Sequence, residues 1–157
     1  MSAEGATVKN TPKGWPRIST AIFYKDAAAA IDWLCAAFGF EVRLKVEGDG
    51  GRIEHSELTF GDGVIMVGTE GPTPGRPHHE FMRSPKSLGG QITQSLMVYV
   101  DDVNAHFARA KAAGATVLSE PKVHDYGEDY WADRSYGATD FEGHQWWFTE
   151  RVRDPKK

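Results

Sequence analysis

The sequence has little of what disulfide cross-linking, membrane insertion or export would require. Its 157 residues include one cysteine, Cys35, so the chain cannot form an internal disulfide. The longest apolar runs, such as residues 95–100, are far shorter than the roughly 20 residues that a membrane-spanning helix needs. Residues 1–15 are polar and contain glycine and proline, so we expect no export leader. We therefore expect a cytoplasmic protein with no membrane partner.

An excess of positive charge is also lacking. Lys and Arg number 18 against 22 Asp and Glu, which gives a net charge of −4 at pH 7. Proteins dedicated to nucleic acids present a basic face, so we expect no nucleic-acid partner. The sequence also has no glycine-rich phosphate loop, no Cys-x-x-Cys pair and no Gly-x-Ser-x-Gly motif. Nucleotide-binding, kinase and serine-hydrolase functions therefore have no support from motifs.

The composition that remains is that of one ordinary folded domain. Apolar residues make up 40% of the chain and charged residues 25%, which is typical of globular proteins. A length of this size predicts about one domain. We expect a flexible tail over residues 1–16, a single domain over 17–151 and a second tail over 152–157. Within the domain we distinguish module one (17–68), a connecting arm (69–93) and module two (94–150).

The first module alternates strand and helix signals. Residues 18–24 form a β-rich run, and Asp26 stands where a helix N-cap is expected. Apolar residues recur at helical spacing over residues 27–38, and Gly39 follows where a left-handed C-terminal residue is favoured. Three further strands are predicted, with glycine turns between them: residues 40–46, 52–60 and 64–67.

The second module repeats this order. Residues 95–100 predict a strand, Asp102 caps a helix that ends at Gly114, and a shift of 80 places Gly63 on Gly143. Three strands are then predicted, over residues 116–118, 132–139 and 145–149. Two copies of β-α-β-β-β predict an α+β fold, with mostly antiparallel sheets curled around a cup-shaped hollow.

The connecting arm carries no periodic pattern. Its 25 residues form a long segment for a compact domain, so we expect a lid, a dimer-contact arm or a mobile segment. The arm contains His78, His79 and Glu80 in a proline-rich stretch. Consecutive residues do not converge on one ion without other partners, so we expect a solvated loop unless the arm folds over the cup.

Five motifs together resemble a known family. They are Phe23-Tyr-Lys-Asp26, Phe60-Gly-Asp-Gly63, the run 84–90, Tyr99-Val-Asp-Asp102 and Asp140-Phe-Glu-Gly-His144. This set resembles the vicinal-oxygen-chelate superfamily, which includes glyoxalase I, extradiol dioxygenases and the fosfomycin- and bleomycin-resistance proteins. It is most similar to the PhnB-like, glyoxalase-like subgroup, over nearly the whole chain. The resemblance implies the glyoxalase/bleomycin-resistance fold and a homodimer, because members commonly complete each site with modules from two chains.

The resemblance also implies where a metal would be bound. Metal-dependent members place His, Gln or Glu at four points inside the cup, and this chain has Ser19, Val67, Ser95 and Trp147 there. None of these offers the imidazole, carboxylate or thiolate that zinc or iron sites use. We therefore expect no metal cofactor, with a divalent metal on other ligands as the alternative.

Strand alternation then assigns a ligand-binding set to the cup. Trp147 and Tyr99 would stack on a planar or amphipathic molecule, so the sequence predicts metal-independent binding of a small, partly aromatic ligand. Sequestration, as in the bleomycin-resistance branch, is one form of this function; the bland alternative is a filled cavity in a scaffold protein. The predicted ligand-binding residues are Ser19, Phe23, Val67, Ser95, Met97, Tyr99, Gln145 and Trp147.

An enzymatic alternative rests on His55 and Glu57. The two share one strand face, where an adjacent pair can act as general base and orienting group. A solvated edge or a salt bridge would give the same pattern. The alternative function is that of a glyoxalase-like lyase, isomerase or dioxygenase. It would use this pair as catalytic residues, or displaced metal ligands that include residues 78–80.

Two further stretches have open interpretations. The run from Tyr126 to Trp131 contains three aromatic residues, which suits either the rim of a pocket or a dimer interface. His144 follows the turn glycine Gly143, and we expect it mainly to bond the backbone of the turn.

Overall fold

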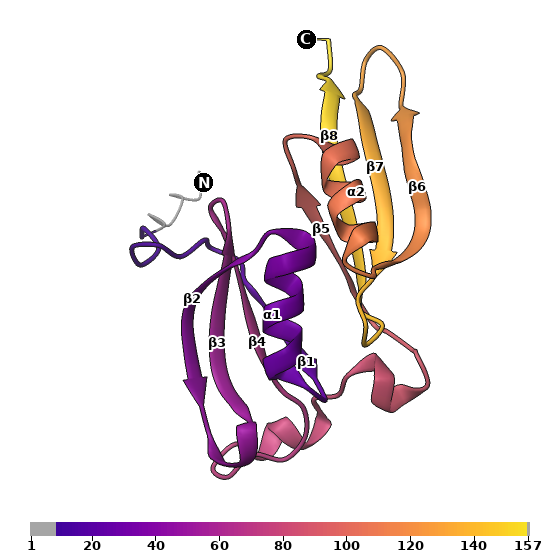
Figure 1. The fold of residues 1–157 in the computed structure, drawn as a ribbon. Coiled ribbons are helices and arrows are strands. Elements are labelled where there is room, and N and C mark those ends of the chain that lie inside the picture. Colours follow the sequence, from indigo (N-terminus) through magenta and orange to yellow (C-terminus); the bar gives the residue numbers. More distant parts are fainter. Residues whose placement is uncertain (1–8, 157) are drawn as a thin grey trace.

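The computed structural model describes residues 9–156, and it contains two modules of the same element order (Figure 1). Three short 3₁₀ helices, η1 (Asp49–Gly51), η2 (Pro77–Phe81) and η3 (Pro85–Leu88), lie in the connections. Module one consists of β1 (Thr20–Tyr24), α1 (Ala27–Phe38), β2 (Glu41–Glu47), β3 (Ile53–Phe60) and β4 (Gly63–Thr69). Module two consists of β5 (Ser95–Tyr99), α2 (Val103–Ala112), β6 (Thr116–Asp125), β7 (Ala132–Thr139) and β8 (Gln145–Arg153).

Each module forms one mixed four-stranded sheet. The strand orders are β1-β4-β3-β2 and β5-β8-β7-β6. The first strand pairs in parallel with the last, and the other neighbours are antiparallel. The predicted α+β class and the duplication of a β-α-β-β-β unit are therefore confirmed. No helix among the described residues is long and apolar enough to cross a membrane.

The predicted helix caps form as expected. The Asp26 carboxylate accepts a hydrogen bond from the Ala29 amide at 3.0 Å, and Asp102 accepts one from Ala105 at 3.0 Å. Such caps satisfy amide groups that have no partner within the helix. Gly39 ends α1 at a φ of 83°, a backbone conformation that disfavours residues with a Cβ. Helix α1 consequently has the predicted bounds.

The two helices join the modules. Figure 1 shows the sheets side by side, with both helices on the same side of them. The Trp33 indole donates to the Ala113 carbonyl at 2.9 Å, and Arg109 donates to the carbonyls of Ala36 and Cys35 at 2.8 and 3.0 Å. Around these bonds, large side chains from both modules form one buried core, among them Ile22, Leu34, Phe38, Tyr136, Trp146 and Phe148.

The turn between β7 and β8 makes a second connection between the modules. The Tyr24 hydroxyl donates to Asp140 at 2.7 Å, and burial, with Asp140 beside it, raises the pKa of Tyr24 well above its ordinary value. Glu142 is buried and accepts hydrogen bonds from the Lys25 and Asp26 amides at 2.7 and 2.9 Å. His144 does more than the expected turn bonding, because its imidazole is 2.8 Å from the Phe23 carbonyl of module one.

Because the helices pack together, the opposite face of each sheet lies open in a single chain. We call it the helix-free face. Leu44 and Val46 on β2 are each 43% exposed, and Met97 and Tyr99 on β5 are 56% and 49% exposed. The modules and their sheets are as predicted, but one chain alone does not enclose a hollow with these faces.

Strand β6 and the arm differ from the predictions. The predicted strand over residues 116–118 continues to Asp125, because an irregularity between Ser119 and Lys122 accommodates Pro121 in the β6–β7 pairing. The arm contains η2 and η3 and is anchored to the sheet by Glu70. The Glu70 amide donates to the Tyr24 carbonyl at 2.9 Å, and its carboxylate accepts from the Ser84 amide at 2.6 Å.

Candidate functional site

Most of the predicted ligand-binding residues of module two lie together on the helix-free face of its sheet. Strand pairing places Ser95 beside Gln145 and Met97 beside Trp147. Tyr99 follows on the same side of β5, since alternate residues of a strand share a face. We call this surface, formed by Ser95, Met97, Tyr99, Gln145 and Trp147, the aromatic face.

Trp147 lies flat on the sheet in the middle of the aromatic face. Its neighbour across the strand pair is Gly137, and a Cβ placed on that glycine would lie 2.6–2.9 Å from three carbons of the indole ring. Gly137 does not have a positive φ, so the backbone does not require glycine there. The missing side chain instead leaves the space that the indole occupies.

The far end of the aromatic face carries a guanidinium held in place by several partners. Arg151 donates to Asp133 at 2.6 Å and to the Tyr99 hydroxyl at 3.1 Å. Its guanidinium carbon lies 5.4 Å from the centre of the Trp131 ring, a cation–π distance. The hydrogen bond to Asp133 raises the pKa of Arg151, so the charge is fixed. The Tyr126–Trp131 run forms the β6–β7 connection, and its Trp131 borders this face.

Val67 does not belong to the binding set, which corrects the prediction. It pairs with Ile22 across the parallel strands β1 and β4, so both side chains point to the helix-covered side. Val67 is only 1% exposed and lies in the core. Its neighbour Met66 takes the helix-free face instead, beside Ala21 and Glu57.

Phe23 and Ser19, the other predicted residues of module one, are separated along β1. The Phe23 ring is partly buried and contacts the arm, where its centroid lies 5.5 Å from that of the His79 ring. Ser19 lies just before the start of β1, and its hydroxyl oxygen is buried without a hydrogen-bond partner in the structure.

The predicted pair His55 and Glu57 meets on the helix-free face of module one. The His55 Nε2 lies 3.6 Å from the Glu57 Oε2, and Glu57 is 8% exposed. Arg43 donates to the other carboxylate oxygen at 3.1 Å, and the Trp15 ring covers the guanidinium at 4.7 Å. The sequence analysis missed Arg43 and Trp15, since one comes from an irregular point of β2 and the other from the expected tail.

The arm reaches the same side of module one. His79 and Arg76 line a cavity of about 180 Å³ together with His55 and Met66. The His79 Nδ1 lies 3.2 Å from the Thr73 hydroxyl. Partial burial lowers the pKa of His79, and His78 and Arg76 add to that shift. His79 is thus held against the sheet rather than solvated.

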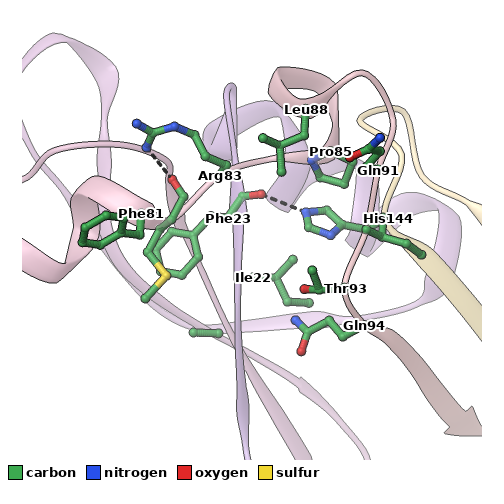
Figure 2. Close-up of a pocket in the computed structure, with 13 residues that line it drawn as sticks. Ile22, Phe23, Phe81, Arg83, Pro85, Leu88, Gln91, Thr93, Gln94 and His144 are labelled. Carbon is green, nitrogen blue, oxygen red and sulfur yellow. Dashed lines mark hydrogen bonds between the residues drawn. The ribbon is translucent and has the colours of Figure 1, made fainter.

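A second cavity lies where the arm passes β1 (Figure 2). It has a volume of about 250 Å³ and separates β1 from the segment that leads into β5. Figure 2 shows Phe81 and Leu88 of the arm, Gln94 before β5, and His144 bonded to the Phe23 carbonyl. The arm therefore forms a wall of this cavity.

The residues at the four family metal positions do not fit a metal ion. Val67 is buried in the core, Trp147 lies against Gly137, and Ser19 and Ser95 offer hydroxyl groups only. Over residues 9–156, no group of three or more His, Cys, Asp or Glu side chains is placed to hold a metal ion. Hard or borderline divalent ions prefer carboxylate and imidazole donors, which these four positions lack.

Comparison with known proteins agrees with this architecture. An uncharacterised protein of Mycobacterium bovis is 31% identical over 139 residues, which cover 88% of this chain and 86% of that protein. The crystal structure of TioX from Micromonospora sp. ML1 is 31% identical, with a TM-score of 0.64 over 86% of this chain and 95% of TioX.

A more distant structure shares the fold alone. The fosfomycin resistance protein FosX of Listeria monocytogenes, crystallised with Mn(II) and a dihydroxypropylphosphonic acid, is 13% identical with a TM-score of 0.54. It covers 83% of this chain and 85% of FosX. The family model named Glyoxalase/Bleomycin resistance protein/Dioxygenase superfamily matches residues 18–148. With two β-α-β-β-β modules and this match over most of its length, the chain belongs to that superfamily.

Proposed function

We propose that this protein binds a small, partly aromatic molecule on the aromatic face without a metal ion. The observation that carries the proposal is the flat, partly exposed indole of Trp147 over Gly137, with Met97 and Tyr99 beside it. A planar ligand stacks on such a surface, because offset aromatic contacts add to the burial of apolar area. Ser95 and Gln145 at one end and Tyr99 at the other supply hydrogen bonds that orient the ligand.

The proposed site is completed by a second copy of the chain. Exposed apolar side chains on both sheets, including Leu44, Val46 and Met97, favour a homodimer in which module one of one copy covers module two of the other. The ligand would then be enclosed on both sides. Sequestration, as in the bleomycin-resistance branch, suits a closed site that lacks metal ligands, and the motifs favour the PhnB-like subgroup and a cytoplasmic location.

A fluorescence titration tests the proposal. We expect 2-naphthoate to quench tryptophan emission and its saturated analogue decahydro-2-naphthoate to bind at least tenfold more weakly, because only the former stacks. Trp147→Ala should weaken 2-naphthoate binding by at least tenfold, whereas the matched control Trp131→Phe should change it by less than threefold. An unchanged Kd in Trp147→Ala would refute the aromatic face as the binding site.

A second function is favoured by one specific contact, the 3.6 Å approach of His55 to Glu57. Arg43 holds the carboxylate, so Glu57 is the orienting group and His55 is the base that removes a proton from a carbon next to a carbonyl. Exchange of the α-protons of hydroxyacetone in D₂O, followed by NMR, tests this chemistry. Loss of exchange in His55→Gln with unchanged 2-naphthoate binding supports an enzyme; equal exchange in His55→Gln and the unaltered protein excludes this base.

A further inference from the structure

The seam between the modules holds a third cavity, which the proposed function does not use. Strands β1 and β5 are edge strands of their sheets, and the cavity lies between the residues that lead into β1 and strand β5. Its volume is about 370 Å³, within the range of small-molecule sites. We call it the seam pocket.

The walls of the seam pocket are mainly apolar and come from both modules. Phe40, Phe60 and Ile65 belong to module one, and Leu96 and Val98 belong to module two. Leu96 and Val98 lie on the helix-covered side of β5, opposite the side of Trp147, because they alternate with Met97. The seam pocket is therefore distinct from the centre of the aromatic face.

One polar group inside the seam pocket has no partner. Ser19 lines the pocket, and its Oγ is buried with less than 1 Å² exposed and no hydrogen bond. A buried hydroxyl without a partner destabilises the protein by about 1–3 kcal/mol relative to a bonded one. A ligand that brings a hydroxyl group to this point would restore the hydrogen bond, and few native side chains are left unpaired in this way.

Two polar residues lie at the rim of the seam pocket. The Tyr99 hydroxyl accepts a hydrogen bond from Arg151, so its own proton is available to a ligand. Asp62 lines the same cavity with an exposed carboxylate. The pocket thus combines apolar walls, one hydroxyl partner inside and polar groups at the entrance.

We propose that the seam pocket is a second binding site, for a single-ring molecule with one hydroxyl group, such as a phenol. The ring contacts Phe60, Leu96 and Val98, and the ligand hydroxyl pairs with the Ser19 Oγ. This site does not depend on the aromatic face or on the function proposed for it, since it uses the other side of β5.

Ligand-observed ¹⁹F NMR tests the site with two matched probes, 4-fluorophenol and fluorobenzene. We expect the phenol to bind roughly five- to tenfold more tightly, the ratio that one neutral hydrogen bond supplies. Ser19→Ala should bring the two Kd values within twofold of each other. This variant should fold normally, because it removes an unpaired polar atom.

Two controls locate the probes. Leu96→Trp fills the pocket and should abolish binding of both probes, and the smaller Leu96→Phe serves if Leu96→Trp does not fold. Trp147→Ala should leave the ratio unchanged. A phenol preference that persists in Ser19→Ala overturns the proposal, as does absence of binding by both probes or loss of both in Trp147→Ala.

Discussion

The two modules share one scaffold and differ on the surface that it leaves open. Both have a helix capped by an aspartate, Asp26 or Asp102, and both place the first strand in parallel with the last. On the helix-free side, module one presents the charged pair His55 and Glu57, whereas module two presents the indole of Trp147. The duplication therefore maintains the core, while the open faces are free to differ in chemistry.

The turn before the last strand offers the strongest way to break this comparison. A shift of 80 residues pairs Glu142, which is 3% exposed, with the exposed Asp62. Glu142→Ala removes the acceptor of two backbone amides and of the Ser84 hydroxyl, so we expect a loss of about 2–4 kcal/mol in the free energy of unfolding. Asp62→Ala should change it by less than about 0.5 kcal/mol. Urea unfolding measures both, and equal losses would contradict the interpretation.

Glycine positions on the two open faces differ in the space around them. A Cβ at Gly137 would lie 2.6 Å from the Trp147 ring, but one at Gly68 would meet the Phe23 ring at 3.4 Å, an ordinary contact. Gly137→Ala should lower stability by about 1–3 kcal/mol and weaken 2-naphthoate binding by tenfold or more, because the indole must move. Gly68→Ala should do neither. Thermal unfolding and the fluorescence titration check both variants.

A titratable residue on α2 has an apolar counterpart on α1. His106 lies between the Tyr136 hydroxyl at 2.6 Å and the Phe38 carbonyl at 2.8 Å, and a shift of 76 places it on buried Ala30. Burial lowers the pKa of His106 below its ordinary value, and the nearby Arg109 adds to this effect.

The pH dependence of stability follows from this direction. The unfolded chain takes up the proton first, so the contribution of His106 is complete above about pH 6.5 and is lost as the pH falls through the lowered pKa. The urea midpoint should fall between pH 7 and pH 5, and it should fall less in His106→Gln. An identical pH profile in His106→Gln would rule out His106 as the source.

The smallest expected effect concerns the contact that holds the charged pair of module one. Trp15 stacks on Arg43, and Arg43 donates to Glu57. Trp15→Ala should cost about 0.5–1 kcal/mol, typical of an exposed cation–π contact, while Trp15→Tyr should retain most of it. Urea unfolding measures the difference, and proton exchange of hydroxyacetone reports whether the pair is disturbed. A cost as large in Trp15→Tyr as in Trp15→Ala would argue against stacking.

Local signals predicted the framework of the fold well, because the responsible residues are neighbours in the chain. Asp26 and Gly39 act within one turn of α1, so the bounds of that helix could be predicted. Strand β6 was cut short because Pro121 argues against a continuous strand, and only the partner β7 shows how the irregular pairing absorbs it.

The candidate site was predicted less completely, because its geometry depends on contacts between distant segments. Alternation placed Met97, Tyr99 and Trp147 on one face, whereas Val67 was assigned to the wrong side because its register comes from pairing with β1. The seam pocket and the open faces follow from the packing of α1 against α2, which no local pattern encodes.

The bonds that join the modules have a consequence for how the chain can diverge. Trp33, Arg109 and His144 each bond main-chain carbonyls of the other module, and Glu142 accepts main-chain amides. A carbonyl is present whatever the side chain, so substitutions at Ala36, Phe23 or Ala113 leave those acceptors in place. Each half can accumulate changes on its open face while the joint persists, and recognition can drift between relatives without refitting the two halves to each other.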